Sequence, residues 1–177
     1  MSLTRRRALE VGGGSLAAFL LGPSLAIAVE PIEIAMQGDS SGAHVWFDPV
    51  GVHIQPGQTV RWTNRDPGNA HTTTAYHPTL FDRSRRIPET ATPWDSDYLL
   101  PDQSFSLTFT EEGVYDYYCL PHEHAGMVGR IVVGSPPAME PDYLADADLT
   151  LPPDVALANL PAVADILAQG VVHPAKT

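Results

Sequence analysis

The chain has 177 residues but only one cysteine. A single thiol excludes an internal disulfide and every zinc site built from two or more thiolates. Basic residues are also few, because 10 Lys and Arg against 21 Asp and Glu give a formal net charge of −11. Phosphate binding requires clustered Lys and Arg, so this balance argues against a nucleic-acid partner. The lone thiol therefore needs a role other than cross-linking.

The first 28 residues have the composition of an export signal. Three arginines, Arg5 to Arg7, precede an uncharged segment, residues 11–28, that ends in the small-x-small pattern Ala-Ile-Ala. The arginines resemble a twin-arginine leader, which exports folded proteins; an ordinary secretory leader and an uncleaved membrane anchor are the alternatives. Cleavage after Ala28 would leave seven basic and 20 acidic residues, a net charge of −13. We expect a periplasmic or other extracytoplasmic location, where an unpaired thiol has to be buried or bound.

Residues 29–134 have the alternation of a β protein. Val60 and Trp62 fall on one face of an expected strand, and every second residue of Ser104–Phe109 is apolar. Such period-two segments, separated by turn residues, predict an all-β, antiparallel Greek-key sandwich or barrel with seven or eight strands and no helix. With 44% apolar residues, the chain has enough material for a core.

Two segments depart from this pattern. Residues 76–101 form a long connection with four prolines, which we expect to be packed because it also carries apolar side chains. The arginines within residues 83–86 are expected to pair with nearby carboxylates. Residues 135–177 hold seven prolines, six acidic residues and one lysine. Apolar positions recur every three or four residues from 154 to 169, so we predict a Pro-rich acidic tail with one or two short helices, packed on the domain or on a partner.

One expected loop carries three residue types that bind metals together. Cys119, His122 and Met127 lie within nine residues, between two expected strands. A thiolate, an imidazole and a thioether suit copper better than zinc, calcium or magnesium, and a blue-copper centre combines two histidines, one cysteine and a long axial methionine. The loop supplies three of these four ligands. His71, which follows an expected strand, is the better candidate for the fourth, because His124 would crowd a site already held by its neighbour.

Residues 32–134 resemble the small blue copper proteins of the plastocyanin type, with halocyanin-like, pseudoazurin-like and amicyanin-like members, in the cupredoxin family. The Cys-x-x-His-x-x-x-x-Met spacing matches the plastocyanin loop, and residues 56–64 resemble the strand that leads to the first histidine ligand. The resemblance implies a cupredoxin-like sandwich that binds one type 1 copper ion. The copper ligands it implies are His71, Cys119, His122 and Met127.

Four protein ligands leave no open position for a substrate, so the expected function is one-electron transfer and not catalysis. The resemblance implies redox partners such as c-type cytochromes or respiratory and photosynthetic electron carriers, docking transiently near His122 of a monomer. The acidic charge favours partners with a basic face. Copper storage or delivery on the same fold is the main alternative. A multicopper enzyme subunit would need several His-x-His pairs where this chain has one, and a redox-inactive interaction module would not need the complete ligand set.

Overall fold

The computed structural model describes residues 30–137 and 149–175. The export signal predicted for residues 1–28 lies outside the described residues. Within those two described ranges, no helix has both the length and the hydropathy that a membrane span needs. The elements in chain order are β1 (Ile32–Gly38), β2 (Val45–Asp48), β3 (Gly51–Ile54), β4 (Gln58–Asn64), β5 (Thr74–Ala75), β6 (Ser104–Phe109), β7 (Gly113–Tyr118), the 3-10 helix η1 (Leu120–Ala125), β8 (Val128–Val133), α1 (Asp154–Asn159), α2 (Val163–Gln169) and β9 (Val171–Val172).

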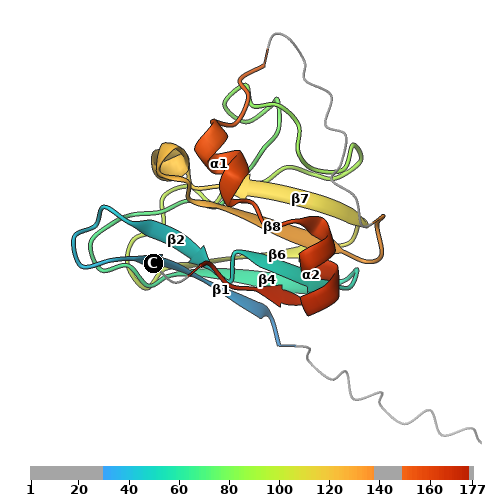
Figure 1. Ribbon diagram of the computed structural model, residues 1–177, viewed down its shortest axis with the longest axis horizontal. Coiled ribbons are helices and arrows are strands. Elements are labelled where there is room, and N and C mark those ends of the chain that lie inside the picture. Colours follow the sequence, from blue (N-terminus) through green and yellow to red (C-terminus); the bar gives the residue numbers. More distant parts are fainter. Residues whose placement is uncertain (1–29, 138–148, 176–177) are drawn as a thin grey trace, which may run out of the picture.

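The strands form two sheets that pack face to face, as the alternating sequence predicted (Figure 1). One sheet has the order β2-β1-β4-β6 and the other has the order β5-β7-β8-β3-β9. Most neighbouring strands are antiparallel, but β1 with β4 and β3 with β8 are parallel. The expected β-sandwich is confirmed, but these two pairs are parallel where antiparallel pairing was expected. The chain passes into the other sheet at β3, between β2 and β4, so β4 returns in the same direction as β1.

The space between the sheets is filled by the apolar faces of the alternating strands. Val60 and Trp62 of β4 are fully buried, as predicted. The Trp62 ring contacts aromatic rings from three other segments, and among these Tyr117 of β7 lies 5.4 Å away and Trp94 lies 6.0 Å away between ring centroids. Trp94 belongs to the long connection of residues 76–101. That connection is therefore anchored in the core, which confirms that it is packed.

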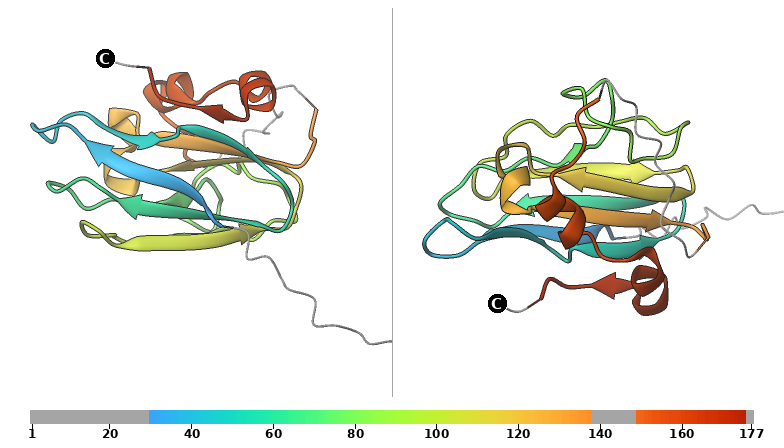
Figure 2. Two further views of the ribbon diagram at one scale, coloured as in Figure 1. Left: turned by 90° about the horizontal axis from the view of Figure 1, so that it is seen from below. Right: turned by 45° about the horizontal axis from the view of Figure 1, so that its top comes forward.

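The C-terminal helices add a third layer on the outer face of the β5-β7-β8-β3-β9 sheet (Figure 2). Val163 and Ile166 are fully buried against Val114 of β7 and Val132 of β8. The prediction of one or two short helices is confirmed, since the structure has two, α1 and α2, and Pro161 lies between them. Because β9 also pairs with β3, the described part of the tail packs on the sandwich itself.

The arginines of residues 83–86 all face carboxylates, as expected. The pairs are Arg83 with Glu123, Arg85 with Glu89 at 4.0 Å, and Arg86 with Asp116 at 2.9 Å. Asp116 also accepts two hydrogen bonds from Arg130, its cross-strand neighbour, and both side chains are at most 1% exposed. A further Arg130 N–H donates to the carbonyl of Pro161 at 2.9 Å, so this buried ion pair also fastens the tail.

Candidate metal centre

The predicted metal-binding loop joins β7 to β8 and spans residues 119–127; we call it the Cys119 loop. Most of it forms η1, with Pro121 in the first turn and Gly126 ending it at a φ of 80°. A φ in the left-handed region favours glycine. The prediction of no helix between the strands is thus wrong here, because a six-residue 3-10 segment with a kink at His122 is too short and irregular to show an apolar periodicity.

Three donor atoms converge where the Cys119 loop meets the connection between β4 and β5, which carries His71. His71, Cys119 and His122 place their ligand atoms within 4.8 Å of one another. The two histidine Nδ1 atoms are 3.2 Å apart, and the Cys119 Sγ lies 3.5 Å from Nδ1 of His71 and 3.4 Å from Nδ1 of His122. An ion at the centre of such a triangle lies about 2 Å from each corner, which is a normal metal–nitrogen bond length. The arrangement therefore fits a first-row metal ion.

Met127 and His124, the other residues that sequence reasoning considered, lie in different environments. Met127 is fully buried, its N–H donates to the carbonyl of His122 at 3.1 Å, and its carbonyl accepts from Cys119 N–H at 3.0 Å. These bonds fix the Met127 backbone beside two of the three converging residues. His124 is exposed and is not part of the converging group.

A buried carboxylate fixes the orientation of His71. Nε2 of His71 lies 3.1 Å from Oδ2 of Asp66, and both side chains are at most 1% exposed. With Nε2 paired in this way, Nδ1 is the nitrogen that faces Cys119. Burial alone would raise the pKa of Asp66, but hydrogen bonds from Asn69, the Gly68 amide and His71 outweigh it and lower this pKa. Asp66 was not predicted, because nothing in the sequence distinguishes it from other acidic loop residues.

Burial keeps the three converging donors uncharged in the metal-free protein. Burial raises the pKa of Cys119 to about 12, although a hydrogen bond of 3.3 Å from Thr72 N–H to the Sγ acts to lower it. Burial also lowers the pKa values of His71 and His122, so both imidazoles are uncharged at neutral pH. Since copper takes cysteine as the thiolate, a metal ion that binds here displaces the thiol proton.

One edge of the site reaches the surface. His71 and Cys119 have no exposed area, but His122 is half-buried. Its loop neighbours Pro121 and Ala125 are exposed. His122 is therefore the one member of the triangle that a docking protein can approach.

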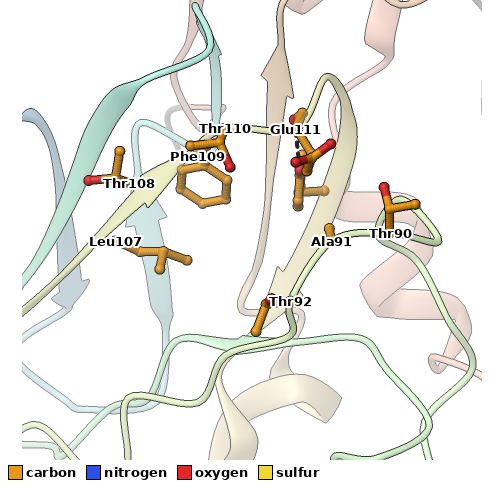
Figure 3. A pocket seen from close by; sticks show the side chains of 9 residues that line it. Thr90, Ala91, Thr92, Leu107, Thr108, Phe109, Thr110 and Glu111 are labelled. Carbon is orange, nitrogen blue, oxygen red and sulfur yellow. Dashed lines mark hydrogen bonds between the residues drawn. The ribbon is translucent and has the colours of Figure 1, made fainter.

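A separate hollow lies at the opposite end of β7. It has a volume of about 160 Å³ and is lined by residues of β6, the following turn and residues 90–92 (Figure 3). Its lining includes Glu111 and Tyr115, near the beginning of β7, whereas Cys119 follows the end of that strand. The hollow does not overlap the converging donors.

Comparison with known proteins agrees with this geometry. The family described as copper binding proteins of the plastocyanin/azurin family matches residues 33–134, which is more than half of the chain. The chain is 35% identical over 136 residues to the chloroplast plastocyanin of Tetradesmus obliquus, covering 75% of this chain and 84% of that protein. It is 33% identical over 93 residues to amicyanin of Paracoccus denitrificans, covering 51% and 60%.

Among solved structures, a purple cupredoxin from Nitrosopumilus maritimus matches with a TM-score of 0.44 and 29% identity, covering 58% of this chain and 99% of that one. The matched residues 33–134 contain His71 and the Cys119 loop, which together supply the three converging donors. Copper is accordingly the metal that this protein binds. The chain belongs to the plastocyanin/azurin family of copper-binding proteins.

Proposed function

We propose that the protein is an exported type 1 copper protein that carries single electrons between redox partners, with His71, Cys119, His122 and Met127 as the copper ligands. The convergence of two Nδ1 atoms and one Sγ within 4.8 Å supports this most directly. A bound copper ion supplies a one-electron Cu(II)/Cu(I) couple. Four protein ligands leave no position for a substrate, so the site suits electron transfer and not catalysis.

The chain contributes a rigid arrangement of donors. His71 is held by Asp66 on one side and by two backbone hydrogen bonds with Leu99, of 3.1 and 2.8 Å, on the other. Cys119 follows directly on β7, a central strand of its sheet. Buried donors with fixed partners change little when the metal charge changes, which favours rapid electron exchange. Met127 would complete this proposed ligand set with a weak thioether sulfur.

His122 is the proposed exit for the electron. Its half-buried ring, with exposed Pro121 and Ala125 beside it, offers a small apolar face. Small faces of this kind suit the transient encounters typical of electron carriers. We propose that the partners are redox proteins such as c-type cytochromes or respiratory and photosynthetic carriers, attracted through a basic surface by the net negative charge of this chain.

The proposal includes export and a division of the chain. Residues 1–28 are the leader, removed on export by the twin-arginine route; residues 29–134 are the copper domain; and residues 135–177 are the tail. The arginine cluster and the Ala-Ile-Ala pattern support the leader. We propose that the exported protein acts as a monomer.

Spectroscopy of the copper-loaded protein tests the ligand set. Purified protein with one equivalent of Cu(II) is expected to show an intense visible thiolate-to-copper band and a reversible one-electron wave in voltammetry. Cys119→Ser should abolish the band. His124→Ala is the matched control, because it removes an exposed imidazole from the same loop and should leave the band intact. A protein that binds Cu(II) equally well without Cys119, and without colour, would contradict the proposal.

The same preparation separates electron transfer from copper storage or delivery. An electron carrier retains its copper against a competing chelator in both oxidation states, and cycles reversibly. A storage or delivery protein releases Cu(I) readily to an acceptor and shows no reversible wave. Retention with reversible cycling therefore supports the carrier function, and ready release refutes it.

A further inference from the structure

The residue that follows His122 in the Cys119 loop is tied to the long connection. The Glu123 side chain is 1% exposed. Its Oε1 accepts a hydrogen bond of 2.9 Å from the Tyr76 hydroxyl, and its Oε2 pairs with Arg83. The Arg83 guanidinium also lies over the ring of Tyr118, 5.3 Å from its centroid. A buried carboxylate is thus fully partnered immediately beside a proposed ligand.

The residue that precedes Met127 in the same loop is tied to the tail. Nδ2 of Asn159, the last residue of α1, donates to the carbonyl of Gly126 at 3.0 Å. The fit is close, because a Cβ on Gly126 would come within 2.2 Å of that Nδ2. Figures 1 and 2 show α1 lying beside the short helix η1. The loop is therefore contacted from a second side.

The two segments that hold the loop are joined to each other. Ser84 N–H donates to the carbonyl of Thr150 at 3.0 Å, and Thr150 N–H donates to the carbonyl of Asp82 at 2.8 Å. Ala156 of α1 is fully buried against the Tyr76 and Tyr118 rings, which stack at 4.4 Å. Residues 76–84 and 150–159 thus form one connected unit, which we call the clamp.

We propose that the clamp positions the Cys119 loop for copper, with Arg83 and Asn159 as positioning residues that act through Glu123 and Gly126 on His122 and Met127. Each clamped residue is adjacent in sequence to one proposed ligand. Hydrogen bonds inside the loop link the same positions, from Gly126 N–H to the Glu123 carbonyl at 2.9 Å and from Met127 N–H to the His122 carbonyl at 3.1 Å. The role in positioning copper ligands rests on the proposed function, but the effect of the clamp on the loop can be measured without copper.

The first measurement uses hydrogen exchange in the metal-free protein. Asn159→Ala removes one hydrogen bond to the loop, and the net worth of such a bond corresponds to about a fivefold change in an opening equilibrium. We expect the Gly126 and Met127 amides to exchange about fivefold faster, relative to the Trp62 amide of the central strand β4. Arg83→Met, which keeps an apolar stem but leaves Glu123 without its cation, should have a larger effect at the same amides.

Ile166→Ala is the matched control, because Ile166 is a fully buried tail residue that packs on β7 and β8 and not on the loop. It should lower the stability of the whole protein without changing the loop-to-Trp62 exchange ratio. An equal ratio change in Ile166→Ala and Asn159→Ala would overturn the clamp, since the tail would then act only through overall stability. The clamp would also be overturned if neither Asn159→Ala nor Arg83→Met changed the exchange rate of the loop amides relative to the Trp62 amide.

The second measurement uses the copper-loaded variants. The clamp predicts that Asn159→Ala and Arg83→Met alter the copper hyperfine splitting and the reduction potential, whereas Ile166→Ala leaves both unchanged. Asn159→Gln, which retains an amide donor on a longer stem, should recover part of the change. If the wild-type protein shows no thiolate band, the proposed function fails, while the exchange ratio still decides whether the clamp exists.

Discussion

Replacing Asp66 by asparagine tests how the protein orients His71. Both carboxylate oxygens of Asp66 are hydrogen-bond acceptors: Oδ1 accepts from Gly68 N–H at 2.8 Å, and Oδ2 accepts from the Asn69 amide at 2.8 Å and lies 3.1 Å from Nε2 of His71. An asparagine side chain offers one oxygen and one NH2 group. Whichever way it turns, its NH2 faces at least one of these donors. Asp66→Asn therefore cannot reproduce the native hydrogen bonds.

The size of the effect follows from the number of bonds lost. Hydrogen bonds to a charged group contribute about 1.5–3 kcal/mol each, and one or two are lost in a site that is 1% exposed. We expect the free energy of unfolding of the metal-free protein to fall by about 2–4 kcal/mol, measured by urea denaturation. The control is Asp102→Asn, whose carboxylate is 82% exposed beside Arg65, and which should cost at most about 1 kcal/mol.

The pH dependence gives an independent check on the same residue. The folded pKa of Asp66 is lowered from 3.8, so its stabilisation is complete above that value and is lost as the pH falls through the folded pKa. Asp66→Asn should remove this acid-dependent part of the stability. It should also weaken copper binding by about 10–100-fold, since the carboxylate partner of His71, a proposed ligand, is lost. A loss of stability no larger than that of Asp102→Asn would refute the reasoning.

Three further outcomes follow from the structure. Burial raises the pKa values of Tyr115 and Tyr118 to about 12, from the ordinary value of 10.0. The stability contributed by their neutral hydroxyls is therefore present below pH 10 and is lost as the pH rises toward 12. Circular dichroism should show unfolding as these two tyrosines ionise, and ionisation of Tyr115 or Tyr118 in a folded protein would contradict this. Gly129→Ala should lower the free energy of unfolding by about 1–3 kcal/mol in thermal denaturation, because the new Cβ would meet the Tyr117 ring at 2.3 Å. Electron exchange with a basic redox partner should slow as ionic strength rises, and a rate that does not depend on salt would argue against electrostatic steering.

The sequence predicted the site best where the site residues are close together in the chain. Cys119 and His122 are three residues apart in one loop, so their proximity in space follows from the covalent chain. The fold class followed in the same way from the alternation in segments such as Ser104–Phe109. His71 is 48 residues from Cys119, and its selection over His124 depended on its place after an expected strand and on the crowding expected of His124 beside His122.

Other features depend on tertiary contacts that leave no local pattern. Asp66, Glu123 and Asn159 are ordinary polar residues in the sequence, and only the folded chain shows that each one holds a part of the site. The parallel pairing of β1 with β4 was not predicted for the same reason. Alternation shows which face of a strand is buried, but not which strand lies beside it. The apolar periodicity of the tail predicted its helices, but the contact of the tail with the Cys119 loop could not be predicted.

The environment of Cys119 shows how the protein protects a single unpaired thiol. The thiolate is the form of cysteine that is oxidised and that exchanges with disulfides. Burial raises the pKa of Cys119 to about 12, so the sulfur is a protonated thiol at pH 7, and it has no exposed surface. The metal-free protein is thus protected by burial and by protonation together. If Cys119 is a copper ligand, as we propose, it would lose its proton only when the metal ion binds, and the bound ion would then protect the sulfur. The burial that shapes the site therefore also protects the unpaired cysteine from oxidation and from disulfide exchange.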